Sequence, residues 1–522
     1  EGIDGTRLLA HIARLKNYYN GWPNPEQLRI AWDNFLQKAE YPETLFTYGF
    51  GDGGGGVTEE MQEFADRAAS YPGLPATVQG PEDENFARVR AAAPDKPRWV
   101  GELYLETHRG TYTTQSETKK ANRKNELLLR EAELLGLMAQ DRGAAVDWQA
   151  LRAAWQNLLL LQFHDILPGS SIGEVYREGA QDHARIAATA TSVRDAALEA
   201  LSAQLAGAGQ LLVYNTLSWE RSDVVQATLP AAEELLEAVD GSGRAYPVQV
   251  LGRRDGQAEV AFSPAALPPM GYATFSVRPA GGQPTHSLRI EPQRLENRFF
   301  LLELTPDGTI ARLYDKRAER EVLAEGQQGN VLHLYQDGPE REAAWNVHAT
   351  FEKREYAWDP GTTIEVIESG PVRGGVRIIR WYRDSRIEQD LFLYDRVPRI
   401  DFVTRADWQA RQVMLKVAFP VRVRAPRATY EIQFGAVERP THRNTSWEQE
   451  KFEVCAHHWA DLSEAGYGVS LLNDCRYGYD AHDNVLRLTL LRGPEWPDPD
   501  ADRGYHEFTY SLYPHLGDWV AG

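Results

Sequence analysis

The chain has 522 residues, of which 42% are hydrophobic, so it is long enough to bury several cores in roughly three or four domains of ordinary size. Its 75 acidic residues outnumber its 56 basic residues, and the formal net charge of -19 repels nucleic-acid phosphates and anionic membrane surfaces. We therefore expect no nucleic-acid partner and no membrane partner. An uncharged ligand is compatible with this charge.

The cysteine content indicates a reducing compartment. Cys455 and Cys475 are the two cysteines, which is too few to staple a chain of this length with disulfides. We expect a cytoplasmic location and two buried thiols. No apolar run reaches the roughly 20 residues that a membrane span needs.

The first 99 residues alternate short apolar runs with helical patterns. The apolar runs Arg7–Ile12 and Thr44–Tyr48 predict strands, and the segments Pro25–Lys38 and Thr58–Ser70 predict helices. We interpret residues 1–99 as the C-terminal part of an α/β domain. Two predicted strands are too few for a parallel sheet covered on both faces, which indicates that other segments complete this domain.

A helical region follows. Apolar residues recur at helical spacing from Leu128 to Met138 and from Trp148 to Leu159, and Ile172–Leu205 is rich in alanine. Ser171 and Glu174 have the spacing of a capping box at the start of the last helix. We predict a three-helix bundle over residues 100–206.

Beyond residue 206 the hydrophobic pattern has a period of two, with many β-branched residues between turn signals. We predict a small β-sandwich domain over 207–280 and a large one over 281–522. The fold class expected for the whole chain is multidomain α+β: a remnant of an α/β catalytic domain, a three-helix bundle, then β-sandwich domains. The clearest strand patterns are Leu211–Tyr214, Val224–Leu229, Arg373–Tyr382, Arg386–Leu393 and Arg487–Leu491.

Three segments together are similar to one enzyme family. They are Tyr48–Gly56, which is rich in glycine, Glu102–Gln115, and Gln162–Ser171, in which His164 and Asp165 stand side by side before Pro168-Gly169. In content and order they resemble the retaining α-mannosidases of glycoside hydrolase family 38, in the bacterial and cytosolic branch. The resemblance covers essentially the whole chain and implies hydrolysis of terminal α-linked mannose from oligosaccharides.

Asp52 is the candidate catalytic acid/base. Retaining glycosidases need one carboxylic acid to protonate the leaving oxygen and a second carboxylate to attack the anomeric carbon. Asp52 lies among glycines that let a substrate approach the backbone closely. By resemblance it occupies the acid/base position of the family, although other branches have an adjacent pair of aspartates there. The alternative is an ordinary glycine-rich turn.

His164 is the candidate metal ligand. By resemblance it binds one Zn²⁺, with Co²⁺ as the alternative metal, and Asp165 binds a mannose hydroxyl. One histidine cannot hold zinc alone, and a lone histidine is commonly a satisfied core residue. Asp165 could also cap the helix that follows it.

The Glu102–Tyr112 segment alternates polar and aromatic residues and is expected to line one wall of a cleft. Tyr104 and Tyr112 are candidates for stacking on a sugar face, and His108 and Arg109 for hydrogen-bond donors at the rim. Ordinary surface packing of cations on aromatic rings is the alternative.

Members of the family carry a His-x-Asp pair near their beginning and a nucleophilic Asp further on, and neither has a counterpart in this sequence. We therefore expect a truncated α-mannosidase that is inactive alone and binds zinc weakly. The rival hypothesis is a noncatalytic carbohydrate-binding or scaffold protein. The sequence leaves homo-oligomerisation open.

Overall fold

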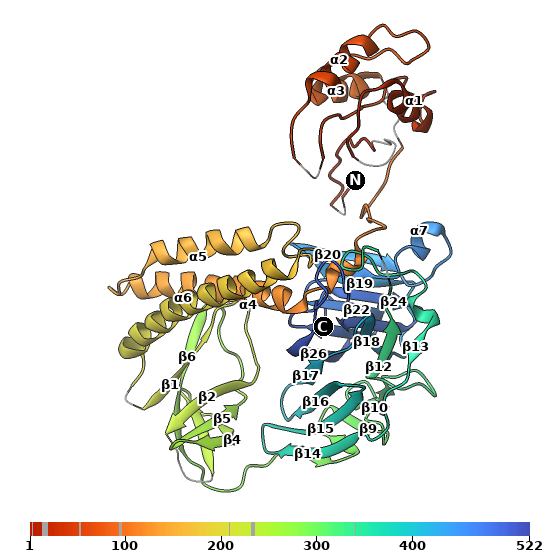
Figure 1. Ribbon diagram of the computed structural model, residues 1–522. Helices are drawn as coiled ribbons and strands as arrows, with labels where there is room; N and C mark the ends of the chain where they lie inside the picture. The colour runs from red at the N-terminus through yellow and green to blue at the C-terminus, as the bar shows by residue number, and fades with distance from the viewer. Residues whose placement is uncertain are drawn as a thin grey trace. The chain divides into compact units, whose positions relative to one another are not determined.

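The structure is a computed structural model, and it describes residues 1–2, 4–12, 19–51, 54–92, 97–207, 209–230, 235–339 and 341–522. The chain divides into two compact units, Glu1–Leu103 and Tyr104–Gly522. None of the helices in these described ranges combines the length and hydrophobicity of a membrane-spanning helix. Figure 1 gives the element labels.

The regular elements of the first unit, in its described residues, are helices. Its helices are α1 (Pro25–Asn34), α2 (Glu59–Ala68) and α3 (Glu82–Ala92). Side chains cap two of them, because Asn24 accepts a hydrogen bond from the Gln27 N–H and Thr58 accepts one from the Met61 N–H.

The prediction of strands at Arg7–Ile12 and Thr44–Tyr48 is wrong. Neither segment is a strand, and the β-pairing found for them in the described residues is an isolated parallel bridge from Tyr48 to Gly21, which lies outside both segments. The physical reason is that a strand needs a hydrogen-bonded neighbour. Leu8 and Ile12 are exposed rather than packed in a sheet.

The second unit begins with three helices that form one layer in Figure 1. The 3₁₀ helix η1 (Arg109–Tyr112) precedes them in the chain. The three helices are α4 (Ser116–Gln140), α5 (Trp148–Leu161) and α6 (Gly173–Leu205). They pack through a core that includes Leu129, Leu151, Leu158 and Ile186. Leu159, which was expected on the buried stripe, is exposed.

The starts of these helices are held in different ways. Asp147 caps α5 locally, accepting from the Ala150 N–H at 2.9 Å. The capping box predicted at the start of α6 does not form, because Ile172 is the N-cap residue and the Ser171 N–H donates to the Tyr176 hydroxyl at 2.8 Å.

The strands of the second unit form four antiparallel sheets in the described residues. In spatial order these are β1-β6-β3-β4-β5-β2, β11-β10-β9-β8-β7, β13-β12-β18-β25-β24-β21 and β14-β15-β16-β17-β26-β23-β22-β19-β20. The first sheet adjoins the helical layer in Figure 1 and has its own core around Phe262 and Phe275. The other three share one large core, in which Leu302, Leu391 and Trp408 are fully buried.

The strand bounds are β1 Gln210–Asn215, β2 Val225–Pro230, β3 Leu236–Asp240, β4 Ala245–Arg254, β5 Gln257–Phe262, β6 Gly271–Pro279, β7 Arg289–Glu291, β8 Arg294–Glu296, β9 Phe300–Leu304, β10 Ile310–Asp315, β11 Arg320–Glu321, β12 Val331–Gln336, β13 Glu355–Tyr356, β14 Thr363–Ser369, β15 Arg373–Tyr382, β16 Ser385–Tyr394, β17 Ile400–Trp408, β18 Val413–Pro420, β19 Arg427–Ile432, β20 Gly435–Pro440, β21 Val454–Cys455, β22 Trp459–Glu464, β23 Tyr467–Asn473, β24 Gly478–His482, β25 Val485–Leu491 and β26 Gly504–Leu516. Two short helices interrupt them, η2 (Phe351–Lys353) and α7 (Ser446–Gln449).

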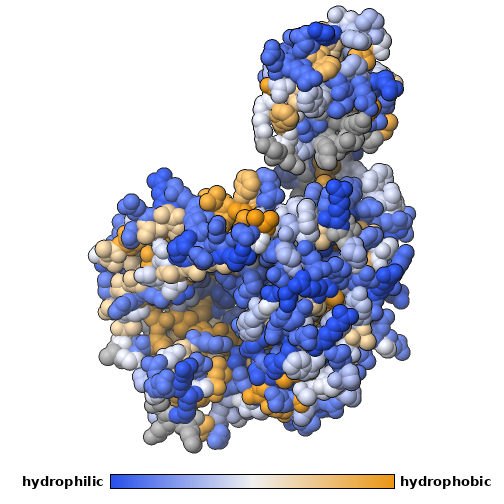
Figure 2. Space-filling view, in the orientation of Figure 1, coloured by the Kyte–Doolittle hydropathy of each residue, from blue (hydrophilic) through white to orange (hydrophobic). Residues whose placement is uncertain are grey.

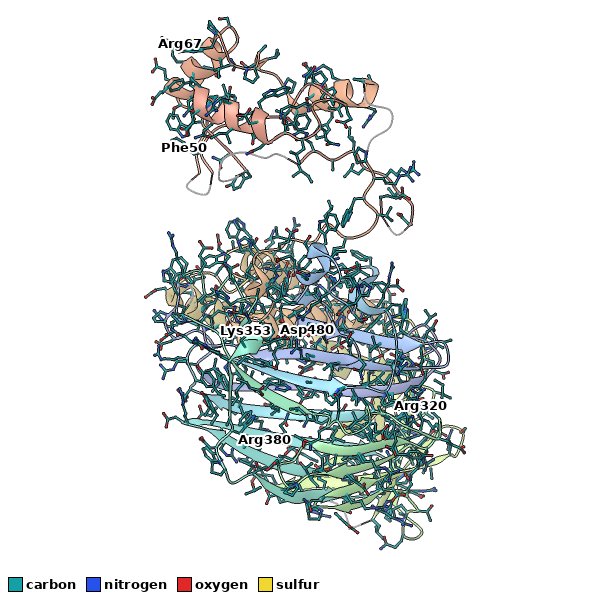
Figure 3. All side chains as sticks on the ribbon, turned by 90° about the vertical axis from the view of Figure 1, so that its right-hand side faces the viewer. Phe50, Arg67, Arg320, Lys353, Arg380 and Asp480 are labelled. Carbon is teal, nitrogen blue, oxygen red and sulfur yellow. The ribbon has the colours of Figure 1, made fainter. Side chains whose placement is uncertain are left out.

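The three sheets that share the large core also hold buried charges. Figure 3 shows their strands stacked one above another, with Asp480 and Arg380 labelled on different strands. Asp480 pairs with Lys416 and Arg487, and Arg380 donates to Gln389 at 3.0 Å and to the Asp307 carbonyl. Each buried charge thus has polar partners, as a low-dielectric interior requires.

Candidate functional site

His164 and Asp165 lie in the turn between α5 and α6. The His164 side chain is 78% exposed, and its Nε2 lies 3.5 Å from the Asp165 carboxylate. The Phe163 ring lies beside the imidazole, with ring centroids 4.2 Å apart. The turn therefore presents an imidazole and a carboxylate together to the surface of the second unit, so His164 is not the buried, satisfied histidine of the alternative interpretation.

A close backbone contact fixes the end of this turn. Gly169 has φ +91°, and a Cβ atom at this position would lie 2.3 Å from the Thr114 carbonyl oxygen. Only glycine combines that conformation with that approach. The residue before it, Pro168, restricts the chain further.

Lys119, in the first turn of α4, stabilises the loop that carries His164. Its ammonium group donates to the carbonyls of Thr114 and Leu167, the latter at 2.9 Å, and its side chain is buried. Burial lowers the pKa of Lys119 to about 7, and the nearby Asp502 carboxylate opposes that shift. Lys119 therefore joins the start of α4 to the turn that carries His164.

Thr114 is in turn held by a buried ion pair. Arg492 donates to the Thr114 hydroxyl at 2.8 Å and to the Asp337 carboxylate at 2.6 and 2.9 Å. Burial raises the pKa of Asp337, while Arg492 opposes the rise. Asp502 completes this support by accepting from the Gln115 and Ser116 N–H groups at 2.9 and 2.7 Å, which caps α4.

The structure gives Arg109 a different place from the rim predicted for it. Arg109 is buried, its guanidinium lies 4.2 Å from the centre of the Phe452 ring, and it donates to the Glu450 carbonyl at 2.8 Å and carboxylate at 2.5 Å. A guanidinium satisfies its five donors most readily among fixed oxygens, and these come from the protein itself. Arg109 therefore anchors η1 rather than facing outward.

Tyr104 is also committed to internal contacts. Its hydroxyl donates to the Glu453 carbonyl at 2.6 Å and accepts from Arg109 at 3.0 Å, and its ring packs against the large core. Burial raises its pKa to about 12. The prediction that Tyr104 lines a cleft wall is therefore not supported by its contacts.

His108 and Tyr112 are the more accessible members of this segment. His108 is exposed with φ 63°, and its backbone N–H donates to the Asn346 side chain at 3.1 Å. Tyr112 is partly buried, and burial raises its pKa. His108 is thus placed at the surface of the second unit, where a ligand hydroxyl can reach it.

Asp52 lies outside the described residues. The loop around it is glycine-rich, and Gly49, Gly54 and Gly55 have positive φ values of 133°, 68° and 136°. The site that the sequence predicted from Asp52 and His164 together is thus described on the His164 side alone.

The described residues do not make a complete zinc site. No group of three His, Cys, Asp or Glu side chains that could hold a metal ion is found among them. His164 and Asp165 provide at most two ligands, whereas a catalytic zinc takes three from the protein. The exposed imidazole fits the role of one ligand and no more.

The second unit also contains site-supporting residues that sequence reasoning missed, namely Lys119, Thr114, Asp337 and Arg492. Asp337 and Arg492 are 155 positions apart in the chain, so no local motif marks them. A lysine in a polar helical turn is ordinarily read as solvent-exposed.

Comparison with known proteins identifies the family. Three family profiles match in chain order: Glycosyl hydrolases family 38 N-terminal domain over residues 1–102, Alpha mannosidase middle domain over 106–201, and Glycosyl hydrolases family 38 C-terminal domain over 295–500. The chain belongs to glycosyl hydrolase family 38. The resemblance carried by the three sequence segments is thereby confirmed.

The most similar relatives include three eukaryotic proteins. Alpha-mannosidase 2C1 of Homo sapiens is 37% identical over 99% of this chain and 48% of its own length, and Alpha-mannosidase G of Dictyostelium discoideum is 31% identical over 99% and 50%. Alpha-mannosidase of Saccharomyces cerevisiae is 32% identical over 99% and 46%. The chain spans about half the length of these family 38 relatives.

A solved structure shares the fold. An alpha-mannosidase from Enterococcus faecalis V583 superposes with a TM-score of 0.72 at 16% identity, covering 95% of this chain and 66% of that one. The chain therefore shares its mixed architecture of helices and several β-sheets with this structure. At this identity the likeness concerns the fold alone.

Proposed function

We propose that this chain is a large C-terminal part of a retaining α-mannosidase that removes terminal α-linked mannose from oligosaccharides. The observation that carries the proposal is the exposed His164–Asp165 pair on a turn held by Gly169 and Lys119. The names of the family 38 relatives supply the substrate class. The domain division at residues 99, 206 and 280 is part of the same proposal.

In this proposal Asp52 protonates the leaving oxygen and later deprotonates the attacking water. The nucleophilic carboxylate and the further metal ligands come from residues outside these 522. Asp165 accepts a hydrogen bond from a mannose hydroxyl, for which its exposed carboxylate is suited. His108 and Tyr112 line the approach, whereas Tyr104 and Arg109 hold η1 in place.

His164 would be one ligand of a Zn²⁺ ion, which supplies Lewis-acid binding of sugar hydroxyls when bound. The exposed position of the imidazole and its neighbouring carboxylate support this role. Co²⁺ is the alternative, and reconstitution of metal-free protein with each ion distinguishes them. We further propose a cytoplasmic location, which cell fractionation would test.

The test of the proposed function is hydrolysis of 4-nitrophenyl α-mannoside by the protein that carries this chain, with the first-formed anomer followed by ¹H NMR. Retention predicts α-mannose as the first product, and initial release of β-mannose contradicts it. Binding of mannose oligosaccharides without any hydrolysis would favour the noncatalytic carbohydrate-binding alternative.

The acid/base role of Asp52 has its own test. In Asp52→Ala, kcat/KM for a mannobiose should fall by about 10³-fold, because its leaving group needs protonation. For 2,4-dinitrophenyl α-mannoside kcat/KM should fall far less, since that leaving group departs unprotonated. Equal losses with both substrates would assign Asp52 another role.

A further inference from the structure

Two tryptophans from distant loops lie against each other on the second unit. Trp345 follows β12, Trp496 lies between β25 and β26, and their ring centroids are 5.2 Å apart with an interplanar angle of 36°. The Ala344 N–H donates to the Trp496 carbonyl at 3.1 Å and ties the two loops together. Trp496 nevertheless remains 50% exposed. The pair therefore presents aromatic surface on which a ligand ring can stack.

The pair is joined directly to the segment that carries His108. The Gly110 N–H donates to the Trp345 carbonyl at 2.6 Å, and the neighbouring Asn346 side chain accepts from the His108 N–H at 3.1 Å. The loop that carries Trp345 is therefore joined to the segment that carries His108.

On its other side the Trp496 loop contacts the start of α6. Asp498 accepts from the Gln115 side chain at 2.7 Å, and a Cβ atom added to Gly173, the first residue of α6, would lie 3.0 Å from the Asp498 carboxylate. One turn later the Tyr176 hydroxyl donates to the Asp165 carbonyl at 3.3 Å. The pair thus lies between the His108 segment and the helix that supports Asp165.

Three carboxylates lie close to the pair in the sequence. The carboxylates of Glu342, Glu495 and Asp498 belong to the residues beside the two tryptophans, and Glu495 is fixed by Arg411 at 2.7 Å. Carboxylates accept hydrogen bonds from sugar hydroxyls and repel anions. An exposed aromatic face with carboxylates nearby has the chemistry of a site for an uncharged pyranose ring.

We propose that Trp345 and Trp496 form a second sugar-binding site, which takes a pyranose ring of a mannose oligosaccharide beside the terminal mannose that would be removed. The proposal rests on the proposed function, and it adds a preference for oligosaccharides over single mannosides. Trp496, as the more exposed ring, makes the stacking contact.

The chain contains a matched control. Trp459 and Trp519 form a second pair with ring centroids 5.4 Å apart and an interplanar angle of 32°, and Trp519 is 39% exposed. Trp459 lies on β22 and Trp519 follows β26, so this pair involves none of the loops that contact η1 or α6.

The experiment compares Trp496→Ala and Trp519→Ala in the active protein on two substrates, mannotetraose and α-mannosyl fluoride, which has no ring beyond the mannose. Trp496→Ala should raise KM for mannotetraose about tenfold and change both constants for the fluoride less than twofold. Trp496→Phe should restore most of the loss, and Trp519→Ala should change neither substrate. Equal effects on both substrates, or equal effects of both variants, would overturn the proposal.

Calorimetric titration with mannotetraose separates the two proposals. If the protein hydrolyses neither substrate, the proposed function fails, but the second sugar site still predicts binding that Trp496→Ala weakens about tenfold and Trp519→Ala leaves intact. Unchanged binding in Trp496→Ala, or no binding to the unmodified protein, would reject the site.

Discussion

The Lys119 ammonium group donates a hydrogen bond to the Leu167 carbonyl at 2.9 Å, three residues after His164. The buried side chain of Lys119 therefore connects the turn that presents His164 to α4.

On the face drawn in Figure 2 the surface is mainly hydrophilic, with hydrophobic patches over the helical layer. Leu160 and Phe163, beside His164, are among the exposed apolar residues.

Lys119→Met should loosen this turn. The substitution keeps the length of the side chain but leaves the carbonyls of Thr114 and Leu167 without their donor. Hydrogen exchange should become faster at the Leu167 and Gly169 amides. Lys120→Met is the control, because Lys120 makes an ion pair at the helix surface with Glu117 at 3.4 Å, and it should leave these amides unchanged.

The lowered pKa of Lys119 predicts a pH dependence of stability. The folded protein releases this proton near pH 7, whereas the unfolded chain holds it up to the usual pKa of 10.5. Between these values the unfolded state binds more protons, so the contribution of Lys119 to the free energy of unfolding rises with pH. The free energy of unfolding can be measured by urea denaturation for the unmodified protein and for Lys119→Met. From pH 7 to pH 9 the value for the unmodified protein should rise relative to the value for Lys119→Met. A constant difference would contradict the lowered pKa.

Gly169→Ala should destabilise the protein more than Gly143→Ala. Both glycines have nearly the same φ, +91° and +89°, but a Cβ atom at Gly169 meets the Thr114 carbonyl at 2.3 Å while one at Gly143 meets nothing within 4 Å. Gly143→Ala therefore carries the cost of the left-handed conformation alone, about 1 kcal/mol. Gly169→Ala adds a steric clash and should exceed it by about 2 kcal/mol in thermal or urea unfolding. Equal losses would mean that the turn shifts freely.

Arg492→Lys should lower the free energy of unfolding by about 3 kcal/mol, because a buried carboxylate loses a bidentate partner. Arg492 and Asp337 are almost completely buried. The control is Arg294→Lys, whose ion pairs with Glu296 and Glu303 at 3.3 Å are largely exposed and should change stability by less than 1 kcal/mol. Similar losses from the two substitutions would argue against the supporting role of Arg492.

Regular patterns made much of the second unit predictable from sequence. Arg373–Tyr382 was predicted as a strand and is β15 with the same bounds, because alternation of burial along a strand leaves a direct trace in the sequence. The three helices were also predicted, since their apolar residues recur at helical spacing. Within the first unit the same reasoning failed at Arg7–Ile12, where apolar residues are present but no strand lies beside them.

The candidate site was predictable only where residues are adjacent in the chain. His164 and Asp165 form a recognisable pair, but their support comes from contacts between distant positions. Asp502 caps α4 although it lies 387 positions from Gln115 in the chain, and no local sequence pattern predicts such a cap. Arg109 was misplaced for the same reason, because its partner Glu450 lies 341 positions away and draws the guanidinium inward.

The most direct test of the central claim is the zinc content of the protein that carries this chain, measured in His164→Ala and His482→Ala. His482 is the matched control, because its imidazole also lies 3.5 Å from the carboxylate of the next residue, Asp483, at an exposed position. The account predicts that His164→Ala loses bound zinc and mannosidase turnover by at least about 10-fold, whereas His482→Ala keeps both. Unchanged zinc content and turnover in His164→Ala would contradict it.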